Sequence, residues 1–170
     1  MRRWLRLNPV HYSSASGEWE TPRDLYHFLS QYGAWTFTLD VCATKDNAKC
    51  PRFLTKEADG LRQSWAREVC WMNPPYGREI GGWVDKAIAE SSEAVTVALL
   101  PARTDTRWFV RIQDRAHKLW WIPGRLCFVG AKYPAPFPSM IVEFATREPW
   151  ENGLQYGALE RGPRGWRWRL

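Results

Sequence analysis

Apolar side chains recur at helical spacing in two segments of the chain. Residues 21–33, TPRDLYHFLSQYG, carry three apolar side chains on one face, with Thr21 as a candidate N-cap, Pro22 at the first helical position and Gly33 as the stop. Residues 80–92 repeat this spacing with five apolar side chains on one face. Two amphipathic helices are therefore predicted.

Strand-like patterns fill much of the remaining chain. Residues 36–41 alternate apolar and polar side chains, whereas residues 94–100 are almost wholly apolar, as in a strand covered on both faces. A third helix is expected after Thr104 or Asp105, either of which suits an N-cap. Helices and strands alternate early and strands dominate late, which predicts an α/β fold with an antiparallel edge. The predicted strands are residues 36–41, 69–72, 94–100, 118–122, 126–129 and 139–145.

Composition narrows the class of protein. The chain has 170 residues, 45% hydrophobic and 25% charged, which predicts a single soluble domain over residues 1–170, with residues 1–17 and about 150–170 less ordered. No apolar run approaches the roughly 20 residues of a membrane span or resembles a secretory signal, so we expect a cytoplasmic protein. The four cysteines form no CxxC pair and there are three histidines, so no metal site is expected.

Positive charge is concentrated at the two ends of the chain. The formal net charge is +6, from 24 Lys and Arg against 18 Asp and Glu, and seven arginines lie in residues 1–10 and 161–170. Those stretches contain no acid, so the remaining 17 bases face 18 acids in a nearly neutral body. Basic ends suit a polyanion such as DNA, with Arg164 and Arg167 as candidate contacts, because each neutralised phosphate releases counterions. The alternative is that the basic ends only aid solubility.

The most specific chemistry lies in Asn73-Pro74-Pro75-Tyr76, directly after the predicted strand 69–72. Proline lacks an N–H donor, so the Asn73 side-chain oxygen and the Pro74 carbonyl can converge on one NH2 group. Tyr76 can stack on a planar base, which contributes roughly 1–3 kcal/mol. Two accepted hydrogen bonds favour a pyramidal amine with an exposed lone pair, so the segment predicts attack of a nucleobase amine on an electrophilic methyl group.

Two other interpretations of this segment are open. Asn-Pro-Pro is common in turns, and Asn-Pro-x-Tyr also occurs as a linear peptide signal read by adaptor domains. A linear signal belongs in an exposed disordered region, whereas this segment lies between a strand pattern and an amphipathic helix. The context therefore favours catalysis.

Several segments, in order, make the chain similar to the phage-encoded DNA N6-adenine methyltransferases, small S-adenosylmethionine-dependent enzymes of phages and prophages. They are EWETPRDLYHFL, TLDVCATKDNAKCPRFLT, ADGLRQSW, CWMNPPYGREIGGWVDKA, LLPARTDTRWF, and GRLCF followed by PFPS, within residues 18–145. The resemblance implies a Rossmann-like methyltransferase fold, with a mixed, mostly parallel sheet and helices on both faces. It also implies S-adenosylmethionine as cofactor, DNA as partner, and a phage or prophage protein that acts in the cytoplasm of a bacterial host.

The resemblance assigns roles to the motif and to the start of the first helix. Asn73, Pro74, Pro75 and Tyr76 match the motif that holds the target amine and stacks the base, and Asn in its first position resembles adenine enzymes more than cytosine-N4 enzymes. The pair Thr21 and Pro22 is similar to a threonine-proline that lies near the methionine part of the cofactor. An ordinary helix start is the alternative for that pair.

Four further positions are implied with alternatives. Asp40 looks like the acidic position at the end of the first strand of the cofactor site, with an N-cap or loop-bridging role as the alternative. Cys42, which is also expected to contact the cofactor, begins a stretch that replaces the usual Gly-x-Gly turn. Asp59 matches an acid that binds the cofactor's adenine amine, or else forms an Asp-Gly turn. Arg103 is expected near DNA, and Asp105 is expected to cap a helix.

The activity implied is transfer of a methyl group from S-adenosylmethionine to N6 of an adenine that is flipped out of the DNA duplex. The nearest rivals are a methyltransferase that acts on RNA or on cytosine N4. A rival from another class is a catalytically silent DNA-binding module with the same fold.

Overall fold

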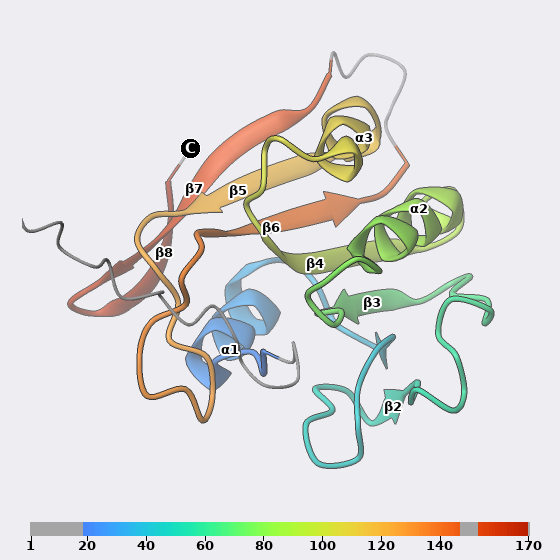
Figure 1. The fold of residues 1–170 in the computed structure, drawn as a ribbon, viewed down its shortest axis with the longest axis horizontal. Coiled ribbons are helices and arrows are strands. Elements are labelled where there is room, and N and C mark those ends of the chain that lie inside the picture. Colours follow the sequence, from blue (N-terminus) through green and yellow to red (C-terminus); the bar gives the residue numbers. More distant parts are fainter. Residues whose placement is uncertain (1–18, 147–152, 170) are drawn as a thin grey trace, which may run out of the picture.

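The computed structural model describes residues 19–146 and 153–169, and within them eight strands form one sheet. The strands are β1 (Leu39–Asp40), β2 (Arg52–Phe53), β3 (Val69–Met72), β4 (Val95–Pro101), β5 (Lys118–Ile122), β6 (Ser139–Phe144), β7 (Gln155–Gly162) and β8 (Gly165–Arg169). Their order is β2-β1-β3-β4-β6-β5-β7-β8 (Figure 1). Pairing is parallel between β1 and β2, β1 and β3, β3 and β4, and β5 and β7, and antiparallel elsewhere. The predicted mixed α/β sheet is confirmed.

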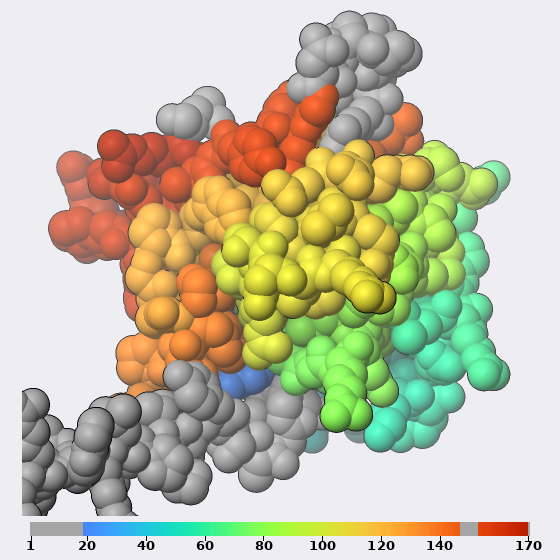
Figure 2. Space-filling model, turned by 45° about the horizontal axis from the view of Figure 1, so that its top comes forward, coloured from blue at the N-terminus to red at the C-terminus, as the bar shows by residue number. Residues whose placement is uncertain are grey.

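Three helices pack on this sheet: α1 (Arg23–Tyr32), α2 (Ile80–Glu90) and α3 (Arg107–Arg115). The buried side chains of α2 and α3, which lie side by side in Figure 2, belong to one apolar cluster, and those of α1 belong to a second. Successive residues of β4 alternate between the clusters, with Ala98 and Leu100 in the first and Val97 and Leu99 in the second. Because successive strand side chains point to opposite faces, the clusters lie on opposite sides of the sheet.

Two sequence predictions need correction in the loops. Residues 126–129 are not a strand, because residues 123–138 form an irregular connection with Gly124 and Gly130 at positive φ. The N-cap of α3 is Thr106, not Thr104 or Asp105: its extended backbone lets the hydroxyl accept from the Phe109 amide at 3.3 Å.

The predicted strand 36–41 shortens to Leu39–Asp40. Thr38 lies just before β1, where its hydroxyl accepts from the Val69 amide and donates to Glu68 at 2.5 Å. The two-residue strand β2 carried no pattern long enough to predict.

The chain end forms a hairpin of β7 and β8 where a loosely ordered basic tail was expected. Along β8 the exposed residues alternate with Trp166 and Trp168, which are half-buried. Trp168 packs with its ring centroid 5.1 Å from Trp120 and 5.9 Å from Trp35, and its indole N–H donates to the Tyr32 carbonyl at 3.1 Å. The tryptophans of β8 therefore fix the hairpin to the sheet and to α1.

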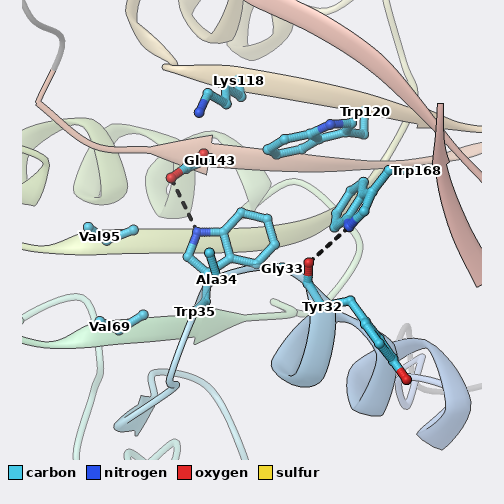
Figure 3. Close-up of a pocket in the computed structure, with 10 residues that line it drawn as sticks. All are labelled: Tyr32, Gly33, Ala34, Trp35, Val69, Val95, Lys118, Trp120, Glu143 and Trp168. Carbon is cyan, nitrogen blue, oxygen red and sulfur yellow. Dashed lines mark hydrogen bonds between the residues drawn. The ribbon is translucent and has the colours of Figure 1, made fainter. Parts of the chain in front are cut away.

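A groove of about 540 Å³ lies beside this packing, at the sheet edge where β3, β4 and β5 begin (Figure 3). Trp35, Trp120 and Trp168 line it, and the Trp35 indole N–H donates to the buried Glu143 carboxylate at 3.2 Å. The indole N–H groups of Trp35 and Trp168 are thus both hydrogen-bonded within the protein. Among the described residues, no helix is long and apolar enough to cross a membrane.

Candidate active site

The chain leaves the sheet at the end of β3. Met72 is the last paired residue, opposite Ala98 of β4, and Asn73 follows at the carboxyl edge of the sheet. The Asn73 amide nitrogen donates to the Trp19 carbonyl at 2.6 Å and to the Thr21 hydroxyl at 3.0 Å. Its side-chain oxygen is buried and accepts no hydrogen bond within the described part of the chain. Asn73 therefore holds an unused acceptor.

The orientation of the Asn73 amide is set by Trp19. A carbonyl oxygen can only accept, so it selects the NH2 end of the amide, whereas the Thr21 hydroxyl can donate or accept. If the amide turned over, its oxygen would face the Trp19 carbonyl and this hydrogen bond would be lost. The side-chain oxygen of Asn73 is consequently held in one orientation, in which it can accept a hydrogen bond from a ligand. An unpaired buried acceptor is costly enough to need a functional explanation.

Pro74 provides a second free acceptor next to the first. Pro74 is buried, and none of residues 19–146 and 153–169 donates to its carbonyl. Pro75, which follows, is exposed and has no N–H to offer it. The two acceptors expected from the sequence thus lie at one corner, where β3 ends.

Tyr76 is anchored beside this corner. Its hydroxyl donates to the Leu99 carbonyl at 3.1 Å, a group that lies beyond the last pair of β3 with β4. Burial raises the pKa of Tyr76 well above its ordinary value, so the hydroxyl is a neutral donor. The anchor fixes the plane of the ring while leaving the side chain half-buried.

Three more aromatic rings gather around Tyr76. The ring centroids of Phe137 and Phe128 lie 5.5 Å and 6.1 Å from that of Tyr76. Trp19 contacts the same two rings at 5.2 Å and 5.1 Å. The sequence prediction did not include these three residues; the signal available was that EWE, GRLCF and PFPS belong to the segments that carry the family resemblance. They make an apolar wall at the Asn73 corner.

Asp40 holds the loop that replaces the Gly-x-Gly turn. Its side chain is 3% exposed at the end of β1, and its two oxygens accept from the Cys42 amide at 3.3 Å and the Lys49 amide at 3.0 Å. Burial raises the pKa of Asp40 to about 6, an effect that the two amides oppose. Of the roles weighed for Asp40, the structure contains the loop-bridging one, and a cofactor contact stays a prediction.

Cys42 lies between Asp40 and the Asn73 corner. Its thiol faces the Asn73 backbone amide, and burial together with the charge of Asp40 raises its pKa, so the thiol is neutral. Burial raises the pKa of Tyr76 as well, with a smaller contribution from the charge that Cys42 would carry if ionised, so the two side chains lie near each other. The predicted cofactor side and the predicted base side of the site are therefore neighbours.

Asp59 lies at the same end of β1. Gly60 packs directly on the Val41 backbone: a Cβ at residue 60 would lie 2.2 Å from the Val41 carbonyl oxygen. This contact brings the loop with Asp59 beside the segment that leaves β1. Asp59 has a positive φ of 53° and forms an ion pair with Arg62 at 3.2 Å, as in the Asp-Gly turn weighed for it. Its cofactor contact stays a prediction.

Thr21 does not cap α1, contrary to the sequence prediction. Pro22 occupies the N-cap position, with no side-chain cap, because its ψ of 131° is extended and the helix begins at Arg23. Thr21 is buried and its hydroxyl accepts from Asn73 instead. Thr21 is thus hydrogen-bonded to the Asn73 motif, and the contact of Thr21 and Pro22 with the cofactor stays a prediction.

The three predicted DNA contacts have different surroundings. Arg103 is exposed just after β4, and Arg164 is exposed in the turn between β7 and β8; neither forms an ion pair with another described residue. Arg167 pairs with Glu160 of β7 at 3.0 Å. No group of three His, Cys, Asp or Glu suited to a metal ion occurs in residues 19–146 or 153–169.

Sequence comparison decides the family. A profile of the DNA N-6-adenine-methyltransferase (Dam) family matches residues 11–139 of this chain. The chain belongs to the Dam family. The resemblance stated from the sequence is confirmed.

Two curated relatives carry the same name. The DNA N-6-adenine-methyltransferase of Haemophilus phage HP1 (strain HP1c1) is 31% identical over 150 residues, which cover 84% of this chain and 83% of the phage protein. That of Escherichia phage T1 is 33% identical over 111 residues, 64% of this chain and 45% of the phage protein. The Dam match contains the whole corner, from Trp19 to Phe137, and ends before the β7–β8 hairpin. The corner is thus in the part of the fold that the Dam family shares.

Proposed function

We propose that this protein transfers a methyl group from S-adenosylmethionine to N6 of adenine in DNA, as membership of the Dam family indicates. The observation that carries the proposal is the buried Asn73 side-chain oxygen, which is oriented but unpartnered, next to the free Pro74 carbonyl and the anchored Tyr76 ring. An exocyclic amine offers two N–H donors, which match these two acceptors.

The two acceptors account for the reactivity of the amine. The lone pair of adenine N6 is delocalised into the ring, so the planar amine is a poor nucleophile. Hydrogen bonds to Asn73 and Pro74 favour a pyramidal nitrogen, whose lone pair then points away from the ring. Positive charge that develops on this nitrogen is stabilised by acceptors already in place, which is the preorganised electrostatic effect that dominates many enzymes. As the N–CH3 bond forms, the S–CH3 bond of the donor would break, and the cationic nitrogen is acidic enough to release its extra proton to water, so no strong base is required.

The target base must leave the duplex to reach this corner. Base flipping costs a few kcal/mol, and stacking on Tyr76 offsets about 1–3 kcal/mol of that free energy. The hydroxyl bond to Leu99 holds the Tyr76 ring in place before the base arrives. The apolar wall of Trp19, Phe128 and Phe137 excludes water from the same corner.

The residues around β1 fit S-adenosylmethionine. Asp40, Cys42 and Asp59 gather at the carboxyl ends of parallel strands, where ligands of such sheets bind, and Thr21 lies against Asn73. When bound, the cofactor supplies an electrophilic methyl group. This arrangement supports a Rossmann-like methyltransferase fold. We also infer that the protein acts in the cytoplasm of a phage's bacterial host, where its DNA substrate is.

The test is a digest of DNA incubated with the protein and S-adenosylmethionine. We expect N6-methyladenine in the nucleosides, and Asn73→Ala as the matched control should form far less. N4-methylcytosine, or methylation of RNA alone, would replace the proposal with one of the other methyltransferases. Saturable S-adenosylmethionine binding is also expected; DNA binding without it would indicate a silent DNA-binding module.

A further inference from the structure

Six strands of the sheet end at the same edge as the Asn73 corner, since β1 and β2 are also parallel to β3. β4 is parallel to β3, and it is antiparallel to β6, which is in turn antiparallel to β5. β7 is parallel to β5. Strands β3, β4, β5 and β7 therefore run in one direction, and the segments that follow them all emerge beside the corner.

These segments carry exposed cations with little opposing charge. The segments after β4, β5 and β7, which are residues 102–106, 123–138 and 163–164, contain Arg103, Arg125, Lys132 and Arg164 against the single acid Asp105. The segment after β3 adds one base and one acid, Arg78 and Glu79. All four bases after β4, β5 and β7 are exposed, and none forms an ion pair with another residue of the described ranges. The long loop 123–138 has no acid at all. A row of unpaired positive charge thus follows the carboxyl edge.

The arginines of the hairpin strands differ because they are neutralised within the protein. Arg161 pairs with Asp24 at 2.7 Å, and Arg167 and Arg169 pair with the two carboxylate oxygens of Glu160 at 3.0 Å and 2.9 Å. These ion pairs lower the pKa of Glu160, so its negative charge persists. A phosphate would have to displace this carboxylate from Arg167 and Arg169, whereas nothing has to leave Arg125 or Arg164.

The width of the sheet gives a scale for the length of the row. Neighbouring strands lie about 4.8 Å apart, so the three intervals from β4 to β7 span about 14 Å. This length covers about four phosphates of one DNA strand at its rise of about 3.4 Å. β3, which carries Asn73, is the next strand beyond β4. A backbone laid along this edge therefore passes beside the corner.

We propose that Arg103, Arg125 and Arg164 form a phosphate-binding row that holds one strand of duplex DNA along the carboxyl edge while an adenine enters the Asn73 corner. Lys132 supplies further positive charge from the same loop as Arg125. Arg167 is not part of the row because it forms an ion pair with Glu160. The inference rests on the proposed function for its substrate, and it adds the surface on which that substrate lies.

The test compares two double variants that remove equal charge. Arg125→Gln with Arg164→Gln removes two members of the row. Arg67→Gln with Arg115→Gln removes two exposed arginines, also without ion pairs among the described residues, from positions before β3 and β5 at the opposite edge. Binding of a labelled DNA duplex is measured by fluorescence anisotropy over a range of salt concentrations. The slope of log K against log salt is negative, and the row variant should reduce its magnitude by about 1.8, since each phosphate contact contributes about 0.9.

The opposite-edge variant should leave this slope unchanged, and Arg125→Lys with Arg164→Lys should retain most of it. An unchanged slope in the row variant overturns the inference. Equal losses in both variants overturn it as well, because net charge alone would then explain binding. Thermal melts establish that each variant is folded. Failure of the proposed function has a different signature: the parent protein would form no N6-methyladenine although the slopes still differed.

Discussion

Thr21 should affect methyl transfer through the orientation of Asn73, and a double-mutant cycle can measure this. Asn73→Ala removes an oriented acceptor from the reacting amine, so turnover should fall by about 10²–10³, as when one preorganised contact is lost. Thr21→Val removes one of the two acceptors of the Asn73 NH2 group and leaves the Trp19 carbonyl as the other. Loss of one neutral hydrogen bond costs about 0.5–1.5 kcal/mol, or roughly 2–13-fold in rate.

The cycle is run under single-turnover conditions, with labelled S-adenosylmethionine and saturating duplex DNA, so that the transfer step is observed. Thr21→Val in the Asn73→Ala background should cause no further loss, because the group that Thr21 positions is gone. Thr21→Ser keeps the hydroxyl and should retain most of the parent rate. The reasoning is refuted if Thr21→Val matches the parent, or if its effect is as large without Asn73 as with it.

Three further predictions concern the supports of the site. The pKa of Asp40 rises from 3.8 in the unfolded chain to about 6 in the folded protein, which therefore binds the proton more tightly. The contribution of Asp40 to the free energy of unfolding is complete below pH 3.8 and falls by up to about 3 kcal/mol as pH rises through 6. Urea titrations at pH 4 and pH 7 should show this loss of stability in the parent protein. Asp40→Asn should not show it. Gly60→Ala forces a Cβ to 2.2 Å from the Val41 carbonyl oxygen, so the free energy of unfolding should fall by about 1–3 kcal/mol or more, and an unchanged melting temperature would contradict the contact. Tyr76→Phe loses the bond to Leu99 and about 1 kcal/mol of stability but keeps the ring, whereas Tyr76→Ala should also lose about 1–3 kcal/mol of base binding, measured with DNA that contains an unpaired adenine.

The central elements of the fold were predictable because their patterns are local. β4 is an apolar run because its side chains enter two apolar clusters in alternation, and α2 shows its buried face at helical spacing. The β7–β8 hairpin was not predictable in this way. Its residues look like a basic tail, and they form strands because Trp168 reaches Trp35 and Tyr32, which lie far away in the sequence. The segment does contain a short period-2 pattern, in which Trp166 and Trp168 alternate with arginines, but its concentrated positive charge indicated a tail, and the partners that fix it lie outside the segment.

In the site, too, local features could be predicted from the sequence and long-range contacts could not. Asn73 and its two prolines could be predicted because their chemistry is contained in consecutive residues, and the strand before them fixes where they emerge. For Thr21 the sequence left two roles open, a place near the cofactor and an ordinary helix start, since a threonine before a proline commonly begins a helix. Its hydrogen bond to Asn73 spans 52 positions, so no local pattern reveals it. Phe128 lies in a segment that was predicted as a strand and that the fold instead uses as the wall beside Tyr76.

The short segment before α1 links the two halves of the site. The Lys49 amide is held by Asp40, and the Lys49 ammonium pairs with Glu20 at 2.9 Å. The next residue, Thr21, holds the Asn73 amide. Continuous contacts thus run from the loop at the end of β1 to the acceptor at the end of β3. We therefore expect that a cofactor bound at this loop, as proposed above, would also stabilise Thr21, and that loss of either support would weaken both predicted halves of the site.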